Sequence, residues 1–406
     1  MPAEFAVAGL PLQTQVPALS AELRLLCLCA RVDLTDSDRR RIEEMVCEPL
    51  DWTLLVKLAH RHCCFALLHR HLNAVCPDAA PPGLMQSLHQ QCQRQAIHNL
   101  KLTADLLKIV SALARVGIDA LPYKGPILTQ IVYGNLALRQ FDDLDILVRQ
   151  RDLDRARIVL KELGFKPLHE NLSGFFVENS FHYVFLDPRS EFNVELHWGL
   201  VMSYIPLKFK GERLWKDLRR IPFGGLSVLG HNLEDLVLAL CIHGGKHHWL
   251  RLSWIIDVAE LIRRNPDLDW NRLLEEAQRL HCRRFVMLGL HLAATILGAP
   301  VPIRVQEQIA RDTAVQKLAV EVWGGLTLPE EVSWDGLKNV AYYCRVRERL
   351  RDRLVFVIRR TITPTEFEVN WQLLPRPLHF LYFPLRFVRM TIEYGGSIAG
   401  RLFGKT

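Results

Sequence analysis

The segment 138–148, LRQFDDLDILV, places aspartates among apolar residues that alternate with period two. In a strand this alternation puts Asp143 and Asp145 on one face, while Leu144, Ile146 and Val148 point the other way into a core. Two neighbouring carboxylates repel each other and raise each other's pKa, and a divalent cation removes that conflict. We therefore expect a third acid on a neighbouring strand. A solvated strand edge is the alternative for an Asp-X-Asp triplet by itself.

The segment 193–197, NVELH, offers that third acid, because Glu195 shares a strand face with Asn193 and His197. Around the two acidic strands the pattern changes repeatedly. We expect a strand at 118–123, a turn at 124–126 and a short helix at 127–134. A helix at 152–163 closed by Gly164 and a hairpin of strands 181–187 and 192–198 should follow. This order predicts an α+β fold with a small mixed sheet.

Helical periodicity fills the rest of the chain. Predicted helices span 19–32, 36–46, 51–72, 83–100, 100–117, 232–249, 251–264 and 270–298. Asp36 or Ser37 and Asp51 are expected N-caps, and Gly117 is an expected C-cap. We expect a helical region at 1–100, an α/β core at 101–230, a helical domain at 231–360 and a basic, aromatic and proline-rich tail at 361–406.

The turn at 122–126, PYKGP, has features of a phosphate-binding turn. Gly125 permits close approach of the backbone to a ligand, and the helix that follows offers free N–H groups. Lys124 could add a positive charge. Arg139 could reach a phosphate or pair with one of the two aspartates. An ordinary strand-to-helix turn is the alternative.

The run 121–148, LPYKGPILTQIVYGNLALRQFDDLDILV, is followed by a helix ending in LGF and then by NVELHW. Together they resemble an uncharacterised nucleotidyltransferase family related to the DNA polymerase beta superfamily. The resemblance covers about residues 50–265 and includes the segment 243–261, HGGKHHWLRLSWIIDVAEL. The matching positions are Lys124, Gly125, Tyr133, Arg139, Asp143, Asp145, Glu195, His197, Trp198, His243, His247, Trp249 and Asp257. The superfamily at large has Gly-Ser or Gly-Gly at the phosphate turn, where this chain has Lys-Gly.

The resemblance implies a magnesium- or manganese-dependent enzyme that moves a nucleoside monophosphate from an NTP such as ATP to an acceptor hydroxyl. Asp143 and Asp145 would bind two divalent ions, and Glu195 would complete the metal site or act as general base. The nucleotide-binding residues would be Lys124, Gly125, Arg139, His197, His243 and His247. The acceptor stays open among a small molecule, a protein and a nucleic acid.

Other functions fit the sequence less well. A degenerate domain that binds a nucleotide or a partner has no reason to keep three converging carboxylates. The net charge of +7 permits nucleic-acid binding, but no compact Lys/Arg stripe with stacking aromatics occurs. His243 and His247 are one helical turn apart, yet zinc would need further ligands that no nearby pair supplies with standard spacing.

Compartment and membrane contact follow from the remaining features. Ten scattered cysteines without a CxxC pair, and no recognisable secretory signal, indicate a cytoplasmic protein with reduced thiols. The apolar segment Phe285–Ile303 is expected to be a buried core helix rather than a span. Prolines 375, 377 and 384 should prevent one continuous amphipathic helix in the tail. We therefore expect the tail to contact the helical regions rather than a membrane surface.

Overall fold

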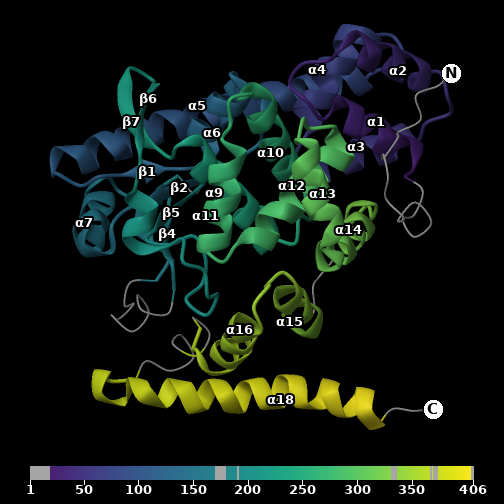
Figure 1. Ribbon diagram of the computed structural model, residues 1–406. Helices are drawn as coiled ribbons and strands as arrows, with labels where there is room; N and C mark the ends of the chain where they lie inside the picture. Colours follow the sequence, from purple (N-terminus) through teal and green to yellow (C-terminus); the bar gives the residue numbers. More distant parts are fainter. Residues whose placement is uncertain are drawn as a thin grey trace.

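The computed structural model describes residues 19–169, 180–189, 192–330, 336–365, 368 and 374–403, with the side chains of 376 and 393–403 left out. A small mixed sheet is embedded among helices from both halves of the chain (Figure 1). The predicted α+β class is confirmed.

The sheet places the two acidic strands side by side. Its order is β1-β2-β5-β4-β3, and only the β2–β5 pair is parallel. The strands are β1 (Leu121–Pro122), β2 (Asp143–Leu147), β3 (Lys166–Pro167), β4 (His182–Leu186) and β5 (Asn193–His197). In the β2–β5 register Asp143 is opposite Asn193 and Asp145 is opposite Glu195. The predicted pairing of 181–187 with 192–198 is confirmed as the antiparallel β4–β5 pair.

One face of the sheet is apolar. Leu144, Ile146 and Val148 are buried in a cluster with side chains of α5 (Leu84–Arg115) and α7 (Leu153–Glu162). This confirms the predicted orientation of the strand and leaves Asp143 and Asp145 on the other face. The helix α6 (Gly125–Tyr133) and the short turns η1 (Leu136–Leu138) and η2 (Gln150–Asp152) complete this part of the chain.

Helix α5 is one unbroken element of 32 residues, where two helices meeting at residue 100 were predicted. No glycine or proline interrupts 84–115, so nothing forces a break. Near its middle the buried Asn99 donates hydrogen bonds to the carbonyls of Leu136 (2.6 Å) and Arg139 (2.9 Å). Helix α5 therefore holds the loop that leads into β2.

The N-terminal helices share one apolar core with the helices that follow the sheet. They are α1 (Ala21–Cys29), α2 (Asp36–Val46), α3 (Trp52–Arg61) and α4 (Phe65–Val75). Their partners are α9 (Leu233–Lys246), α10 (Leu252–Arg264), α11 (Trp270–Arg279), α12 (Arg283–Leu297), α13 (Ile303–Arg311), α14 (Thr313–Leu326), α15 (Gly336–Arg345) and α16 (Leu350–Ile362). Segments far apart in the sequence thus form one helical body (Figure 1).

Some predicted helix limits were wrong. The single helix predicted at 51–72 is divided at Cys63, whose φ of 54° is left-handed. The break lets His62 accept a hydrogen bond from the Leu252 amide through Nδ1 (3.2 Å), which joins α3 to α10. A second predicted helix, 270–298, is divided at His281, where φ is 61°. Thr35 caps α2 in place of Asp36 or Ser37, whereas the Asp51 cap of α3 is confirmed.

Helix α9 continues through Gly244 and Gly245. Two large aromatic rings occupy the space where side chains at these positions would lie. A Cβ atom at Gly244 would lie 2.4 Å from the Trp249 ring, and one at Gly245 would lie 2.3 Å from Phe285. Trp249 is fully buried. The glycine pair therefore packs α9 against the core of the helical body.

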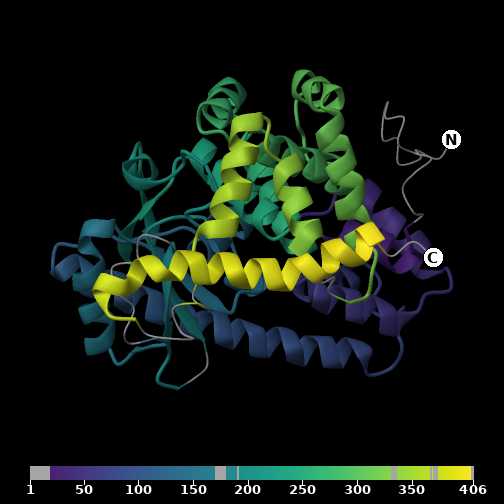
Figure 2. The same cartoon turned by 90° about the horizontal axis from the view of Figure 1, so that it is seen from below.

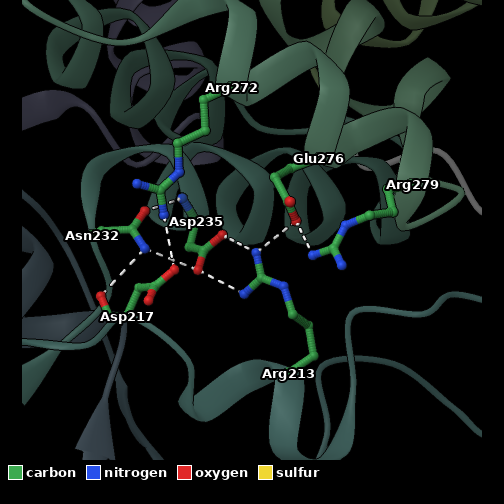
Figure 3. A network of polar contacts seen from close by, with 7 residues as sticks. All are labelled: Arg213, Asp217, Asn232, Asp235, Arg272, Glu276 and Arg279. Carbon is green, nitrogen blue, oxygen red and sulfur yellow. Dashed lines mark hydrogen bonds and ion pairs between the residues drawn. The ribbon is translucent and has the colours of Figure 1, made fainter.

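An ionic network joins the segment after the sheet to the helical body (Figure 3). Arg213, in η3 (Gly211–Trp215), binds both carboxylate oxygens of Asp235 on α9 at 2.8 and 2.7 Å. The same guanidinium donates to Glu276 on α11 at 2.9 Å, and Arg279 donates to that carboxylate as well. Because Asp235 is buried and its contact is bidentate, this network fixes the segment on two helices at once.

The hairpin of β6 (Arg219–Phe223) and β7 (Leu226–Gly230) lies between η3 and α9. At the far end of the chain, η4 (Arg376–Leu381) leads into α18 (Tyr382–Phe403), which lies across α16 (Figure 2). Pro375 and Pro377 lie at the short η4, so the tail does not form one continuous helix, as predicted, but Pro384 sits in the first turn of α18, where a proline is tolerated, and does not interrupt that helix. None of the helices in the described ranges is long and apolar enough to cross a bilayer. The segment Phe285–Ile303 forms the buried α12 and the start of α13, as predicted.

Candidate active site

Three polar side chains from β2 and β5 converge on one face of the sheet. The Nε2 atom of His197 lies 2.8 Å from Oδ1 of Asp145 and 3.1 Å from Oε2 of Glu195. Burial lowers the pKa of His197, but the two carboxylates outweigh that effect and raise it above its ordinary value. The imidazole therefore holds Asp145 and Glu195 together.

Lys124 supplies a second positive charge to the same acids. Its Nζ atom lies 2.7 Å from Oδ2 of Asp145, and both side chains are buried. Burial raises the pKa of Asp145, but Lys124 and His197 outweigh that effect and hold it well below its usual range. The pKa of Glu195 falls to about 2, because the hydrogen bond from His197 overcomes the effect of burial.

Asp143 has the opposite electrostatic environment. Burial and the neighbouring Asp145 carboxylate raise its pKa to about 6. Both Asp143 and Asp142 line the cavity described below, and Asp142 is also exposed, with its Oδ1 atom 3.8 Å from Nε2 of His98. Strand alternation predicts that Asp142 faces away from Asp143, but both residues line the cavity.

The turn before α6 brings backbone close to the acids. Gly125 has a left-handed φ of 55°, and a Cβ atom there would lie 3.4 Å from the Asp143 carbonyl oxygen. A side chain would be strained in that conformation, which explains the glycine. Pro126 follows in the first turn of α6, where its missing N–H costs nothing.

A cavity of about 540 Å³ opens between the acidic face of the sheet and the helical body. One wall carries Lys124, Gly125, Asp143 and Asp145, and the opposite wall comes from α9, α10 and the residues between them. The residues of the opposite wall include His243, Lys246, His247, His248, Leu250, Arg251, Ser253 and Trp254. The cavity thus faces acids on one side and several nitrogen-bearing side chains on the other.

Arg139 also lines the cavity, but its charge is already paired. Its Nε and Nη2 atoms donate to the two carboxylate oxygens of Asp257 at 2.8 and 2.9 Å. The hydroxyl of Tyr133 donates to the same carboxylate at 2.8 Å. Arg139 therefore does not pair with Asp143 or Asp145, which was one of the two predicted alternatives. Asp257 thus organises this buried cluster.

His243 and His247 share the cavity wall, as their spacing predicted. Their ring centroids are 4.8 Å apart, and both rings contact Trp254. Burial, reinforced by nearby lysines, lowers the pKa of both, that of His247 to about 3. Within the described ranges, the one cluster of three side chains that could hold a metal ion is Asp145, Glu195 and His197, so no zinc site forms around His243 and His247.

A comparison with protein families decides the relationship of the chain. The profile of a family described as an uncharacterised nucleotidyltransferase matches residues 48–298, which is more than half of the sequence. The chain belongs to this family. No curated protein and no solved structure matches it. The resemblance drawn from the sequence is confirmed, and the whole cavity lies inside the part of this nucleotidyltransferase chain that the family covers.

Sequence reasoning missed several residues of this nucleotidyltransferase cavity, among them Lys246, Arg251 and Trp254. All three lie in 243–261, the segment singled out for its histidines, Trp249 and Asp257. Trp249 turns out to be a core residue. Helical spacing could have identified Lys246 as a cavity residue, because it adjoins His247 and lies three residues after His243.

Proposed function

We propose that this protein transfers a nucleoside monophosphate from an NTP to an acceptor hydroxyl and releases pyrophosphate. The observation that carries the proposal is the β2–β5 register, which places Asp145 beside Glu195 and Asp143 one pleat away, at the cavity. The acceptor would attack the α-phosphorus, and the bond from that phosphorus to the bridging oxygen of the β-phosphate would break.

The donor set fits Mg²⁺ or Mn²⁺. Asp143, Asp145 and Glu195 would hold the ion through carboxylate oxygens, the ligands that Mg²⁺ prefers. Burial and the neighbouring Asp145 carboxylate raise the pKa of Asp143, and a bound cation would offset both effects. When bound, the metal would neutralise phosphate charge and favour ionisation of the acceptor hydroxyl.

The low pKa of Glu195 bears on its role. A carboxylate with a pKa of about 2 is a weak base, so Glu195 is poorly matched to proton abstraction near neutral pH. We therefore propose Glu195 as a metal ligand rather than as the general base. His197 positions it, together with Asp145, through the two contacts of its Nε2 atom.

The charges in the cavity indicate where the triphosphate would lie. Lys124 is paired with Asp145 and Arg139 with Asp257, so both cations already have carboxylate partners. Among the described residues no carboxylate forms an ion pair with Lys246, which lines the cavity opposite the acids. We propose that Lys246 binds the β- and γ-phosphates together with the N–H groups at the start of α6. Neutral His243 and His247 would contact the nucleoside.

Transfer from the correct phosphate tests the proposal. The protein is incubated with Mg²⁺, a cell extract as the source of acceptor, and ATP labelled at either the α- or the γ-phosphate, and the other NTPs are tested in the same way. The α-label should enter a product while the γ-label appears in pyrophosphate, and Asp145→Asn should abolish both. Asp154→Asn, at an exposed aspartate of α7 outside the cavity, is the matched control and should change neither. Transfer of the γ-label, or full activity of Asp145→Asn, would contradict the proposal.

One observation favours a second function. Lys124 and His197 already compensate the charges of Asp145 and Glu195 without any metal. A domain that only binds a nucleotide could use such an arrangement permanently. This alternative predicts nucleotide binding that is independent of divalent ions and no release of pyrophosphate.

A further inference from the structure

Exposed apolar side chains are concentrated in the last helices of the chain. Of the nineteen large apolar side chains that are exposed in the described residues, eleven lie between Leu350 and Ile392. They are Leu350, Leu354, Val357, Ile358, Ile362, Leu378, Phe380, Phe383, Phe387, Val388 and Ile392. Isolated exposed apolar residues are ordinary, but a concentration of this size marks an interaction surface.

In the part of helix α18 whose side chains the structure describes, residues 382–392, apolar side chains face outward and arginines face the protein. Phe383, Phe387, Val388 and Ile392 follow one another at helical spacing and are exposed, Ile392 by 75%. The opposite side carries Arg386 and Arg389, whose guanidinium groups lie 3.3 and 2.6 Å from Oε1 of the buried Glu368. Arg386 and Arg389 are therefore paired with an acid of the protein, and the apolar side chains described between 383 and 392 face outward.

Helix α16 repeats the pattern with arginines at its border. Leu350, Leu354, Val357, Ile358 and Ile362 have the i, i+4, i+7, i+8 and i+12 spacing of a single helix side, and all are exposed. Arg351, Arg353 and Arg359 lie along this stripe. The acid of this helix, Asp352, is half-buried and lies 3.3 Å from Nδ1 of His281. The charge that accompanies the apolar stripe is therefore positive.

We propose that these exposed residues of α16 and α18, the α16–α18 surface, dock on an anionic lipid membrane. Helices that lie in the plane of a membrane interface insert phenylalanine and leucine side chains and place arginines against lipid phosphates. Helix α18 lies along the outside of the molecule, where such a surface can reach it (Figure 2). Both helices also lie beyond residue 298, the end of the part that the family covers.

The arginines distinguish a lipid surface from a second copy of the chain. A symmetric dimer built on this surface would bring the arginines of two α16 helices into one interface, while Asp352, the acid of this helix, is already engaged by His281. An anionic membrane attracts them instead. The expectation that the tail avoids membranes depended on breaks at Pro375, Pro377 and Pro384, and α18 nevertheless runs unbroken for 22 residues from Tyr382.

Vesicle co-sedimentation of the full chain tests this inference. The probes are vesicles of phosphatidylcholine alone and vesicles of phosphatidylcholine with phosphatidylglycerol. The wild type should bind the anionic vesicles, more weakly as salt increases. Phe383→Ser with Phe387→Ser, and separately Leu354→Ser with Ile358→Ser, should each weaken binding at least about tenfold, because two apolar side chains no longer insert.

Ile303→Ser is the matched control, because Ile303 is 77% exposed but lies on α13, away from this surface. It should bind vesicles like the wild type. Absence of binding to both vesicle types would overturn the inference. So would a wild-type dimer in solution that the phenylalanine substitutions convert to a monomer, because the surface would then join two copies. No nucleotide enters this assay, so its failure leaves the proposed function untouched.

Discussion

Replacement of Lys246 by methionine tests the proposed path of the triphosphate. Methionine keeps most of the length and apolar contacts of the side chain but removes its charge. Lys246 has no carboxylate partner among the described residues, so its loss leaves no buried acid unpaired in the free protein. A hydrogen bond to a charged group contributes ~1.5–3 kcal/mol, so we expect NTP to bind about 10- to 150-fold more weakly.

The pH dependence of NTP binding tests the role of Lys246 independently. Burial and the nearby Lys124 lower the pKa of Lys246 to about 8. Below that pH the amine is charged and can bind phosphate, and above it the free protein has lost the proton. The affinity of the wild type for NTP should therefore be highest between about pH 6, above which Asp143 is ionised, and pH 8, and fall by at most about tenfold per pH unit above pH 8. Lys246→Arg keeps a permanent charge, so its affinity should not fall over the same range.

Calorimetric titration with NTP and with the corresponding NMP completes this test. The NMP lacks the β- and γ-phosphates, so Lys246→Met should bind it with nearly unchanged affinity. Equal losses for NTP and NMP would refute the assignment of Lys246 to those phosphates. Unchanged NTP affinity would refute it as well.

Three further predictions concern the scaffold around the cavity. Asp257→Ala leaves the buried Arg139 without its bidentate partner, so urea unfolding should show a loss of ~3–5 kcal/mol, and adding Arg139→Met should recover part of it. Gly244→Ala would place a Cβ atom 2.4 Å from the Trp249 ring and should lower stability by ~1–3 kcal/mol in the same assay. The control Gly324→Ala, in α14 with open space around the new methyl group, should lower it little or raise it. His231 is buried, and burial lowers its pKa to about 4. The neutral His231 therefore stabilises the folded state above its unfolded pKa, and this stabilisation is lost as the pH falls from about 6.5 to about 4. In His231→Phe the loss of unfolding free energy between pH 7 and pH 4 should be smaller by up to ~3 kcal/mol than in the wild type. An unchanged pH dependence of the unfolding free energy would show that His231 does not contribute to it.

The sheet and its acidic face could be predicted because the chemistry there is local. Period-two alternation fixes the faces of β2 and β5, and Gly125 marks a backbone conformation that few residues tolerate. Family resemblance then joined segments separated by some fifty residues. In these parts the spacing of residues along the sequence determines directly which side of the strand or turn they occupy.

Long-range pairing could not be predicted from the same patterns. Asp257 lies on an apolar helix, and its pairing with Arg139 depends on how α10 meets the loop before β2. No glycine or proline marks the helix break at Cys63 in the sequence. The break accompanies a contact between the neighbouring His62 and α10, which only the folded structure shows. Lys246 was overlooked because only the assembled cavity shows which cations already have acidic partners.

Calorimetric titration of each NTP, with and without Mg²⁺ or Mn²⁺, tests the central claim most directly. It compares the wild type with Asp143→Asn/Asp145→Asn and with the control Asp154→Asn, at an exposed aspartate outside the cavity. We predict metal-dependent binding of at least one NTP by the wild type and by the control, and its loss in the double variant. Binding that needs no metal, or that survives in the double variant, would contradict the assignment of these acids to a metal-dependent nucleotide site.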